Sequence, residues 1–205
     1  MVGAYTFFQP ITQVTHLHKF LIVRFSSIGD IVLTTPVIRA LKNKYPDSEI
    51  HLVTKKAFCD VVRYNPSINK VHLLDGSLLQ LVSTLKREKF THIVDLHHNL
   101  RSLILKLSFI GVKSYTFKKL NFKKWLYISM KRNVMPDIHI VERYLNCVRP
   151  LGVVDDGGGL DFYLPPNVAP ISQLLPQGFS LGYISIVAGA KHFTKRIPPH
   201  RIVEL

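Results

Sequence analysis

Short apolar, β-branched segments alternate with amphipathic segments along most of this chain, and that alternation limits its fold more than any other feature. It is typical of βαβ units, in which helices cover both faces of a parallel sheet. Residues 20–25, with the sequence FLIVRF, form an apolar run of the kind that a buried parallel strand requires. The other predicted strands are residues 49–54, 70–74, 92–96, 114–117 and 183–187. The sequence therefore predicts an α/β fold.

The segments between these strands predict helices. Pro36 interrupts the first of them, which ends at Lys44, and predicts either a kink or a fresh helix with Thr35 as its N-cap. The other predicted helices are residues 57–64, 78–89, 100–110, 122–131, 138–148 and 198–205.

A change of composition marks the end of the first domain. Residues 150–177 contain three consecutive glycines and five prolines, which is typical of a linker. We therefore predict an irregular extension over residues 1–19, a first domain over 20–149, a linker over 150–177 and the beginning of a second domain over 178–205.

The chain is strongly basic, with 27 Lys and Arg against 13 Asp and Glu and a formal charge of +14. Such a charge attracts nucleic acid, an anionic membrane surface or phosphorylated substrates. Nine basic residues and no acidic one lie between Arg101 and Met135. Within this block, residues 122–131 predict either a membrane-surface helix or a solvated helix whose apolar side faces the core. No signature of an RRM, KH, helix-turn-helix or zinc module is present, so we expect no nucleic-acid partner.

Targeting signals are not evident. No apolar run approaches the ~20 residues that a membrane-spanning helix needs. Residues 1–19 lack the basic and apolar regions of a signal peptide. Cys59 and Cys147 lie in apolar surroundings without a CxxC motif, as core residues in a reducing compartment do. We expect a cytoplasmic protein.

The first candidate site is the sequence SSIGD, which follows the first predicted strand. Ligands of open α/β sheets bind at the carboxyl ends of strands, where Ser27, Gly29 and Asp30 should lie. A turn of small residues at a helix start favours polar or anionic ligands. Asp30 either accepts a proton there or only caps the helix that follows.

The second candidate site follows the fourth predicted strand. Asp95, His97, His98, Asn99 and Arg101 converge on the same edge of the sheet. Adjacent histidines point apart, which makes them a poor pair of ligands for one metal. The alternative is a polar loop in which one histidine is satisfied locally.

A third candidate site lies near the end of the chain, in the sequence VAGAKHFTKRIPPHR. Gly189 follows a predicted strand, and Lys191, Lys195 and Arg196 surround the start of a helix. That arrangement suits a phosphate group, although Walker A spacing is absent.

Four motifs in order resemble the ADP-heptose:lipopolysaccharide heptosyltransferase family, glycosyltransferase family 9. They are LIVRFSSIGDIVLTTPVIRALKNKYP, HIVDLHHNLRS, IHIVERYL and AGAKHFTKRIPPHR, and the resemblance runs from about residue 19 to 205. It implies a GT-B fold, in which a Rossmann-like acceptor domain faces a second Rossmann-like domain for the nucleotide sugar. Only the beginning of that second domain is expected here.

The resemblance also implies a reaction and its residues. The family transfers heptose from ADP-heptose to the lipopolysaccharide inner core, with inversion and without a cofactor or required metal. Asp30 matches the general base, and Lys195 matches a lysine at the donor phosphates, beside Thr194 and Arg196. The residues expected to meet the acceptor are Ser27, Gly29, His97, Asn99, Arg101, Lys118, Lys119, Lys123 and Lys124.

The family's acceptor, lipid A carrying Kdo, is a polyanion at the inner face of the cytoplasmic membrane, so a basic protein is drawn to both. Two positions depart from the family pattern, where Ala188 replaces a proline and Ile197 replaces a tryptophan. Because most of the donor domain is absent from residues 1–205, we expect a fragment of the active enzyme, peripheral at the membrane. The alternative is a non-catalytic module that binds the acceptor or an anionic membrane.

Overall fold

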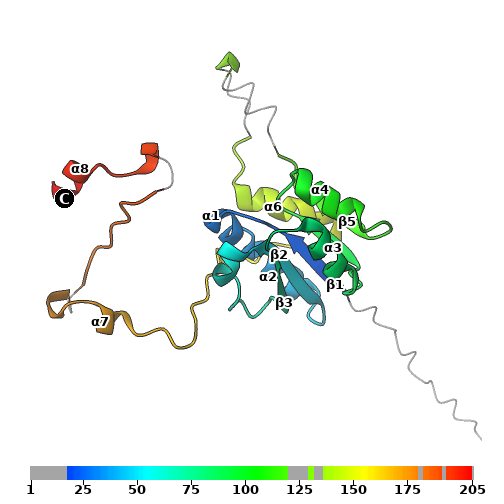
Figure 1. The fold of residues 1–205 in the computed structure, drawn as a ribbon, viewed down its shortest axis with the longest axis horizontal. Helices are drawn as coiled ribbons and strands as arrows, with labels where there is room; N and C mark the ends of the chain where they lie inside the picture. The colour runs from blue at the N-terminus through cyan, green and yellow to red at the C-terminus, as the bar shows by residue number, and fades with distance from the viewer. Residues whose placement is uncertain (1–17, 120–128, 132–135, 180–181, 191–192, 205) are drawn as a thin grey trace, which may run out of the picture. The chain divides into compact units, whose positions relative to one another are not determined.

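The computed structural model describes residues 18–119, 129–131, 136–179, 182–190 and 193–204 (Figure 1). The chain divides into two units, Met1–Leu164 and Pro165–Leu205, which are described separately. The predicted extension over residues 1–19 and the predicted helix over 122–131 fall mostly outside the described residues. Among the described residues, no helix is both long enough and apolar enough to cross a bilayer.

The first unit is built on a five-stranded parallel sheet, which confirms the predicted α/β class. Its strands are β1 (Lys19–Val23), β2 (Glu49–Lys55), β3 (Lys70–Leu74), β4 (His92–Asp95) and β5 (Lys113–Thr116). Their order is β3-β2-β1-β4-β5, so the chain builds outward from β1 in one direction and then crosses to the other side. The resulting switch point between β1 and β4 is where ligands of such sheets bind.

Helices cover both faces of the sheet. One face packs against α1 (Ile28–Val32), α2 (Thr35–Lys44) and α6 (Ile140–Val148), and the other packs against α3 (Leu78–Lys86) and α4 (Leu100–Leu107). Alternate residues of β1 divide between the two cores, with Phe20 and Ile22 in the first and Leu21 and Val23 in the second. All four are fully buried, and each such side chain contributes about 1.5–3 kcal/mol.

Two helix predictions change in detail. Pro36 opens a fresh helix, but Thr34 is the N-cap and Thr35 is already the first helical residue, so the predicted cap was wrong by one position. The segment predicted as a helix over residues 57–64 is a 3-10 turn over Lys56–Val61. The remaining short helices are the 3-10 turns Arg149–Leu151, Gln177–Phe179 and Phe193–Lys195 and the α-helices α7 (Ile171–Leu174) and α8 (Pro199–Val203).

The predicted strand over residues 183–187 does not form. These residues lack regular structure, and the side chains of Ile184 and Val187 are 91% and 83% exposed. A parallel strand requires a neighbouring strand to receive its backbone hydrogen bonds. The described part of the second unit contains no such neighbour, so an apolar run is not sufficient to make a strand there.

Residues that follow α6 fold back onto α2 instead of behaving as a free linker. Val153 is buried in the first core, and the Tyr45 hydroxyl donates to the carbonyl oxygen of Leu151 at 2.8 Å. The Arg39 guanidinium contacts the carboxylates of Asp156 and Asp161 at 2.6 and 2.5 Å. The first compact unit therefore extends to Leu164, whereas composition predicts a first domain over 20–149 and a linker over 150–177.

Gly158 lies close to the Arg39 guanidinium. A Cβ atom at Gly158 would lie 2.8 Å from Nη2 of Arg39, so a larger residue at position 158 would require the guanidinium to shift. Elsewhere in the first unit, Cys59 and Cys147 are both free, and burial raises the pKa of the Cys147 thiol to about 12.

We predict that Arg39→Ala releases residues 155–161 from α2. The substitution removes both ion pairs, and losing such a partly buried charged contact costs about 1–3 kcal/mol. Hydrogen exchange should show at least tenfold faster exchange at the amide of Asp161, which donates to the Thr35 hydroxyl at 2.9 Å. Arg63→Ala is the matched control, because the ion pair of Arg63 joins it to Asp60, three residues away, and not to residues 155–161. Equal exchange in both variants would show that Arg39 does not hold this segment.

Candidate functional site

The candidate site lies at the carboxyl ends of β1 and β4, and a buried arginine organises it. Arg24 directly follows β1 and is 6% exposed. Its guanidinium donates to the carbonyl oxygens of Ser26 and Leu96, to the Tyr144 hydroxyl at 3.0 Å, and pairs with the Asp30 carboxylate at 2.7 Å. A buried charge is tolerated only with such partners. Arg24 therefore joins the end of β1 to the end of β4, to α1 and to α6.

Asp30 is the predicted base, and the structure shows that it caps the helix that follows, as the alternative interpretation expects. The carboxylate accepts from the backbone N–H of Ser27 at 3.3 Å and from its hydroxyl at 2.9 Å, which caps α1. The same oxygen, Oδ2, receives the Arg24 contact. Three contacts thus converge on Oδ2 of a side chain that is 39% exposed.

The ionisation of Asp30 follows from these neighbours. Partial burial acts to raise its pKa, but the charge of Arg24 and the hydrogen bonds from Ser27 outweigh burial and lower the pKa below 3.8. Asp30 is therefore an anion at neutral pH and can accept a proton. Gly29 lies between the two contact residues and has open space around its Cα, with no atom within 4 Å of a Cβ built there.

Asp95 organises the loop that follows β4. It is fully buried, and its carboxylate accepts from the backbone N–H groups of His97 and His98 at 3.0 and 2.8 Å. It also accepts from the Ser102 hydroxyl at 2.8 Å and pairs with Lys106 at 3.1 Å. The Asp95 carboxylate therefore fixes the conformation of this loop.

Asn99 is a helix cap. Its side-chain oxygen accepts from the backbone N–H of Ser102 at 2.9 Å, and the Ser102 hydroxyl accepts from the Asn99 N–H at the same distance. These reciprocal bonds begin α4. Its predicted contact with an acceptor stays a prediction.

Of the two adjacent histidines, His97 faces the site. Its ring packs edge-on against Phe25, with ring centroids 5.0 Å apart, whereas His98 is exposed. Burial and the charge of Arg24 lower the pKa of His97 to about 4, so the ring is neutral. Its Nδ1 is buried and finds no hydrogen-bond partner among the described residues, so the predicted local satisfaction of this histidine is incomplete.

The predicted basic residues differ in their surroundings. Arg101 and Lys118 are exposed. The charge of Lys119 contributes to the lowered pKa of His97, so Lys119 lies near that ring. Lys118, Arg143 and the ring of Phe117 line a cavity of about 430 Å³ beside β5 and α6. Lys123 and Lys124 lie outside the described residues.

The predicted phosphate-binding residues belong to the second unit. Thr194 and Lys195 lie in the 3-10 turn over Phe193–Lys195. Arg196 follows it and donates to the carbonyl oxygen of Ala190 at 2.7 Å.

Two residues of the site were missed by the sequence prediction. Arg24 is a charged residue inside an apolar strand sequence, and a buried charge always needs partners, so this was a usable signal. Tyr144 lies in one of the family-like motifs but was given no role. Its ring packs edge-on against Phe117, with centroids 4.8 Å apart, and its hydroxyl reaches Arg24.

Solved structures define the class of protein to which this fold belongs. A glycosyl transferase family 9 protein from Veillonella parvula matches 91% of this chain with a TM-score of 0.66 at 21% identity, and the match covers 58% of that structure. The Escherichia coli heptosyltransferase WaaC with ADP-2-deoxy-2-fluoro heptose matches 70% of this chain with a TM-score of 0.55 at 18% identity, over 51% of its length. The fold is thus that of the GT-B glycosyltransferases.

Several curated proteins are similar to this chain in sequence. Lipopolysaccharide heptosyltransferase 3 of Escherichia coli K12 is 25% identical over 143 residues, and lipopolysaccharide heptosyltransferase 1 of Campylobacter coli is 24% identical over 136 residues. Each match covers 62% of this chain and 40% of the relative, so the chain spans less than half the length of these relatives. No protein-family model matches the chain. The relatives confirm that this chain resembles part of the lipopolysaccharide heptosyltransferases.

We predict that Arg24→Gln raises the pKa of Asp30 toward its ordinary value, because the nearest positive charge is removed. An NMR titration of the Asp30 carboxyl carbon measures this shift directly. The lowered pKa of Asp30 means that its ionised form stabilises the fold at pH values above the ordinary carboxyl pKa, and this stabilisation is lost as the pH falls through the lowered pKa. The variant should therefore lose the stability that the Asp30 ion pair contributes at neutral pH, and that part of the loss should disappear in acid. Tyr144→Phe is the control, since it removes one bond to Arg24 but keeps the charge. An unchanged Asp30 titration in Arg24→Gln would contradict this account.

Proposed function

We propose that this chain is part of a heptosyltransferase that transfers heptose from ADP-heptose to the lipopolysaccharide inner core, with Asp30 as the general base. The observation that carries the proposal is the Asp30 carboxylate at the switch point of the sheet. It is ionised and partly exposed, and its hydrogen bonds and ion pair with described residues are made by Oδ2. Oδ1 is thereby left to accept a proton from a bound hydroxyl group. The relatives support the choice of sugar and acceptor.

The proposed step is a single displacement. Oδ1 of Asp30 takes the proton of the acceptor hydroxyl as that oxygen attacks the anomeric carbon of the heptose. The bond from the anomeric carbon to the diphosphate oxygen breaks, and ADP leaves with the bonding electron pair. Attack opposite to the leaving group inverts the anomeric centre. Lys195, Thr194 and Arg196 are proposed to stabilise the charge on the departing diphosphate.

The cationic residues around the site suit an acidic glycolipid. Arg101, Lys118 and Lys119 carry the charge that phosphate or Kdo carboxylate groups require. Nδ1 of His97, which has no hydrogen-bond partner among the described residues, is a buried polar atom near Arg24 that an acceptor hydroxyl would satisfy. Lys123 and Lys124, which lie outside the described residues, are also proposed to bind the acceptor.

We predict that Asp30→Asn abolishes transfer and leaves the fold intact. The test is release of ADP from ADP-heptose, with lipid A–Kdo as acceptor, by the protein encoded by the complete reading frame that contains this chain. Loss of a general base typically lowers the rate by about 10²–10⁴-fold. Asp47→Asn is the control, since Asp47 is an exposed carboxylate away from the site. Full turnover in Asp30→Asn would remove Asp30 from the mechanism.

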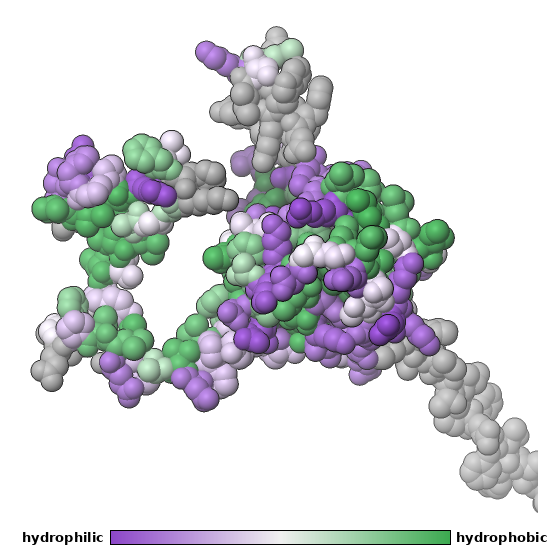
Figure 2. All heavy atoms as spheres, viewed as in Figure 1, coloured by the Kyte–Doolittle hydropathy of each residue, from purple (hydrophilic) through white to green (hydrophobic). Residues whose placement is uncertain are grey.

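We also propose that the first unit lies on the anionic membrane that contains the acceptor. Five apolar side chains form one exposed stripe along and just beyond α4, and Figure 2 shows hydrophobic atoms over this part of the unit. They are Leu100, Leu103, Ile104, Leu107 and Ile110, which are 40–96% exposed. Exposed Arg101 and Lys113 flank the stripe. Apolar side chains with neighbouring cations are what a peripheral membrane surface offers to anionic lipids.

We predict that Leu107→Ser combined with Ile110→Ser weakens binding to phosphatidylglycerol vesicles by at least tenfold, measured by co-sedimentation at low salt. Binding of the unaltered protein should also fall at high salt, because exposed charges are screened. Leu79→Ser on α3 is the control, since Leu79 is 75% exposed outside the stripe. Equal losses of vesicle binding in the double variant and in Leu79→Ser would contradict a specific role for the stripe.

Vesicle binding without ADP release by the complete protein would favour the alternative, a non-catalytic acceptor- or membrane-binding module.

A further inference from the structure

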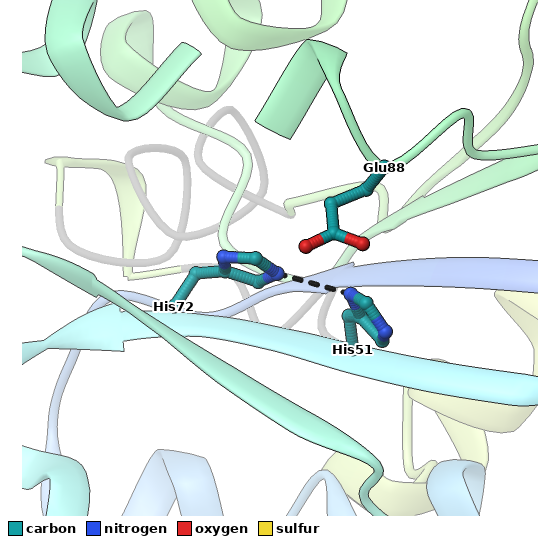
Figure 3. Close-up of side chains that lie close together, drawn as sticks. All are labelled: His51, His72 and Glu88. Atoms are coloured by element: carbon teal, nitrogen blue, oxygen red, sulfur yellow. Dashed lines mark hydrogen bonds between the residues drawn. The ribbon is translucent and has the colours of Figure 1, made fainter. Parts of the chain in front are cut away.

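Two buried histidines and a glutamate meet on the α3 side of the sheet, away from the Asp30 site (Figure 3). His51 lies in β2, His72 lies in β3, and Glu88 follows α3. Nδ1 of His51 and Nε2 of His72 are 3.0 Å apart, and the potential ligand atoms of the three residues all lie within 4.8 Å of one another. The two histidines are 3% and 5% exposed.

The strand register brings these histidines together. Val53 is level with His72, so His51 is two residues earlier on the neighbouring strand and its side chain lies on the same face. Phe90 packs edge-on against both rings, with centroids 5.2 and 6.3 Å away. Adjacent strands and an aromatic neighbour therefore hold both rings in place.

The spacing of the two facing ring nitrogens suits a shared metal ion. The two facing nitrogens can share only one proton. Two imidazoles on one tetrahedral zinc ion have nitrogens about 3.3 Å apart, given Zn–N bonds of ~2.0–2.1 Å. The observed separation of 3.0 Å needs little adjustment to accept an ion.

The surrounding charges complete the site. Hydrogen bonds from Lys70 and Lys19 lower the pKa of Glu88 to about 2, which keeps it an anion. On the far side of the His51 ring, Nε2 lies 3.4 Å from the Glu49 carboxylate. A carboxylate behind a ligating histidine is a common way to orient the ring and increase its basicity. Lys19 keeps Glu49 as a partner at 2.7 Å when Glu88 turns toward an ion.

We propose that His51, His72 and Glu88 bind a divalent transition metal, zinc by preference, with water as the fourth ligand. Two imidazoles and one carboxylate favour zinc over magnesium or calcium, which prefer all-oxygen sites. The ion would join β2 and β3 to the segment after α3, so its role is structural. The proposal does not depend on the transfer reaction or on Asp30.

The competing arrangement is a pair of histidines without an ion. In that arrangement, His72 Nε2–H donates to His51 Nδ1, and His51 Nε2–H faces Glu49. This hydrogen-bonded pair needs no metal, and zinc added to the protein would then bind only at scattered surface groups.

The test is a titration of the EDTA-treated, dialysed chain with zinc chloride, followed by calorimetry. We expect one equivalent to bind, with affinity at least tenfold weaker in His51→Gln and in His72→Gln and several-fold weaker in Glu88→Gln. His200→Gln is the matched control, an exposed histidine of the second unit that should leave the affinity unchanged. Unchanged zinc affinity in both cluster histidine variants would overturn the proposal.

A measurement on the unaltered protein covers the case in which these variants fail to fold. X-ray absorption at the zinc edge of the one-equivalent complex should show two imidazole ligands and oxygen ligands at tetrahedral distances. Cobalt(II) in place of zinc should give the visible absorption of a four-coordinate ion. An octahedral, all-oxygen spectrum for both ions would show that the cluster is only a hydrogen-bonded pair.

Discussion

The candidate site depends on the burial of one guanidinium. Arg24 stands where β1 ends, with almost no access to water, and a lone charge in such a position would be strongly unfavourable. Its partners come from four places in the chain, namely Ser26, Asp30, the carbonyl of Leu96 and the hydroxyl of Tyr144. Satisfying Arg24 thus brings α1, α6 and the end of β4 to one point. The orientation of Asp30 is a consequence of that requirement.

Much of the fold could be predicted because it follows from local apolar patterns. Five of the six predicted strands form, and each is paired with at least one neighbour. Residues 183–187 have the same kind of pattern but no strand beside them among the described residues, and they stay irregular. The contacts of residues 150–161 with α2 could not be predicted for a related reason. Glycine and proline describe local conformational freedom, whereas the contacts of Arg39 with Asp156 and Asp161 join positions more than 110 residues apart.

The sites were predictable in proportion to their proximity in sequence. Ser27, Gly29 and Asp30 form one turn, so their proximity in the fold could be inferred from a short motif. The bond from Arg24 to Tyr144 spans 120 residues, and the pair formed by His51 and His72 depends on the register of β2 against β3. Neither has a sequence spacing that identifies it. The parallel sheet places the two clusters differently, with Arg24 beyond the carboxyl end of β1 and His51 level with Leu21 inside the sheet.

The lowered pKa of Asp30 makes it a weak base in isolation, but in the proposed reaction it helps the carboxylate to lose its proton again after each transfer. The acceptor hydroxyl becomes acidic only as its oxygen bonds to the anomeric carbon, so the carboxylate need not be strongly basic beforehand. Protonation at Oδ1 weakens the ion pair that Arg24 makes with Oδ2, and the protonated group is therefore a stronger acid than a free aspartic acid. It returns its proton to water readily once the product has left. The contact that orients the carboxylate would then also restore it for the next turnover.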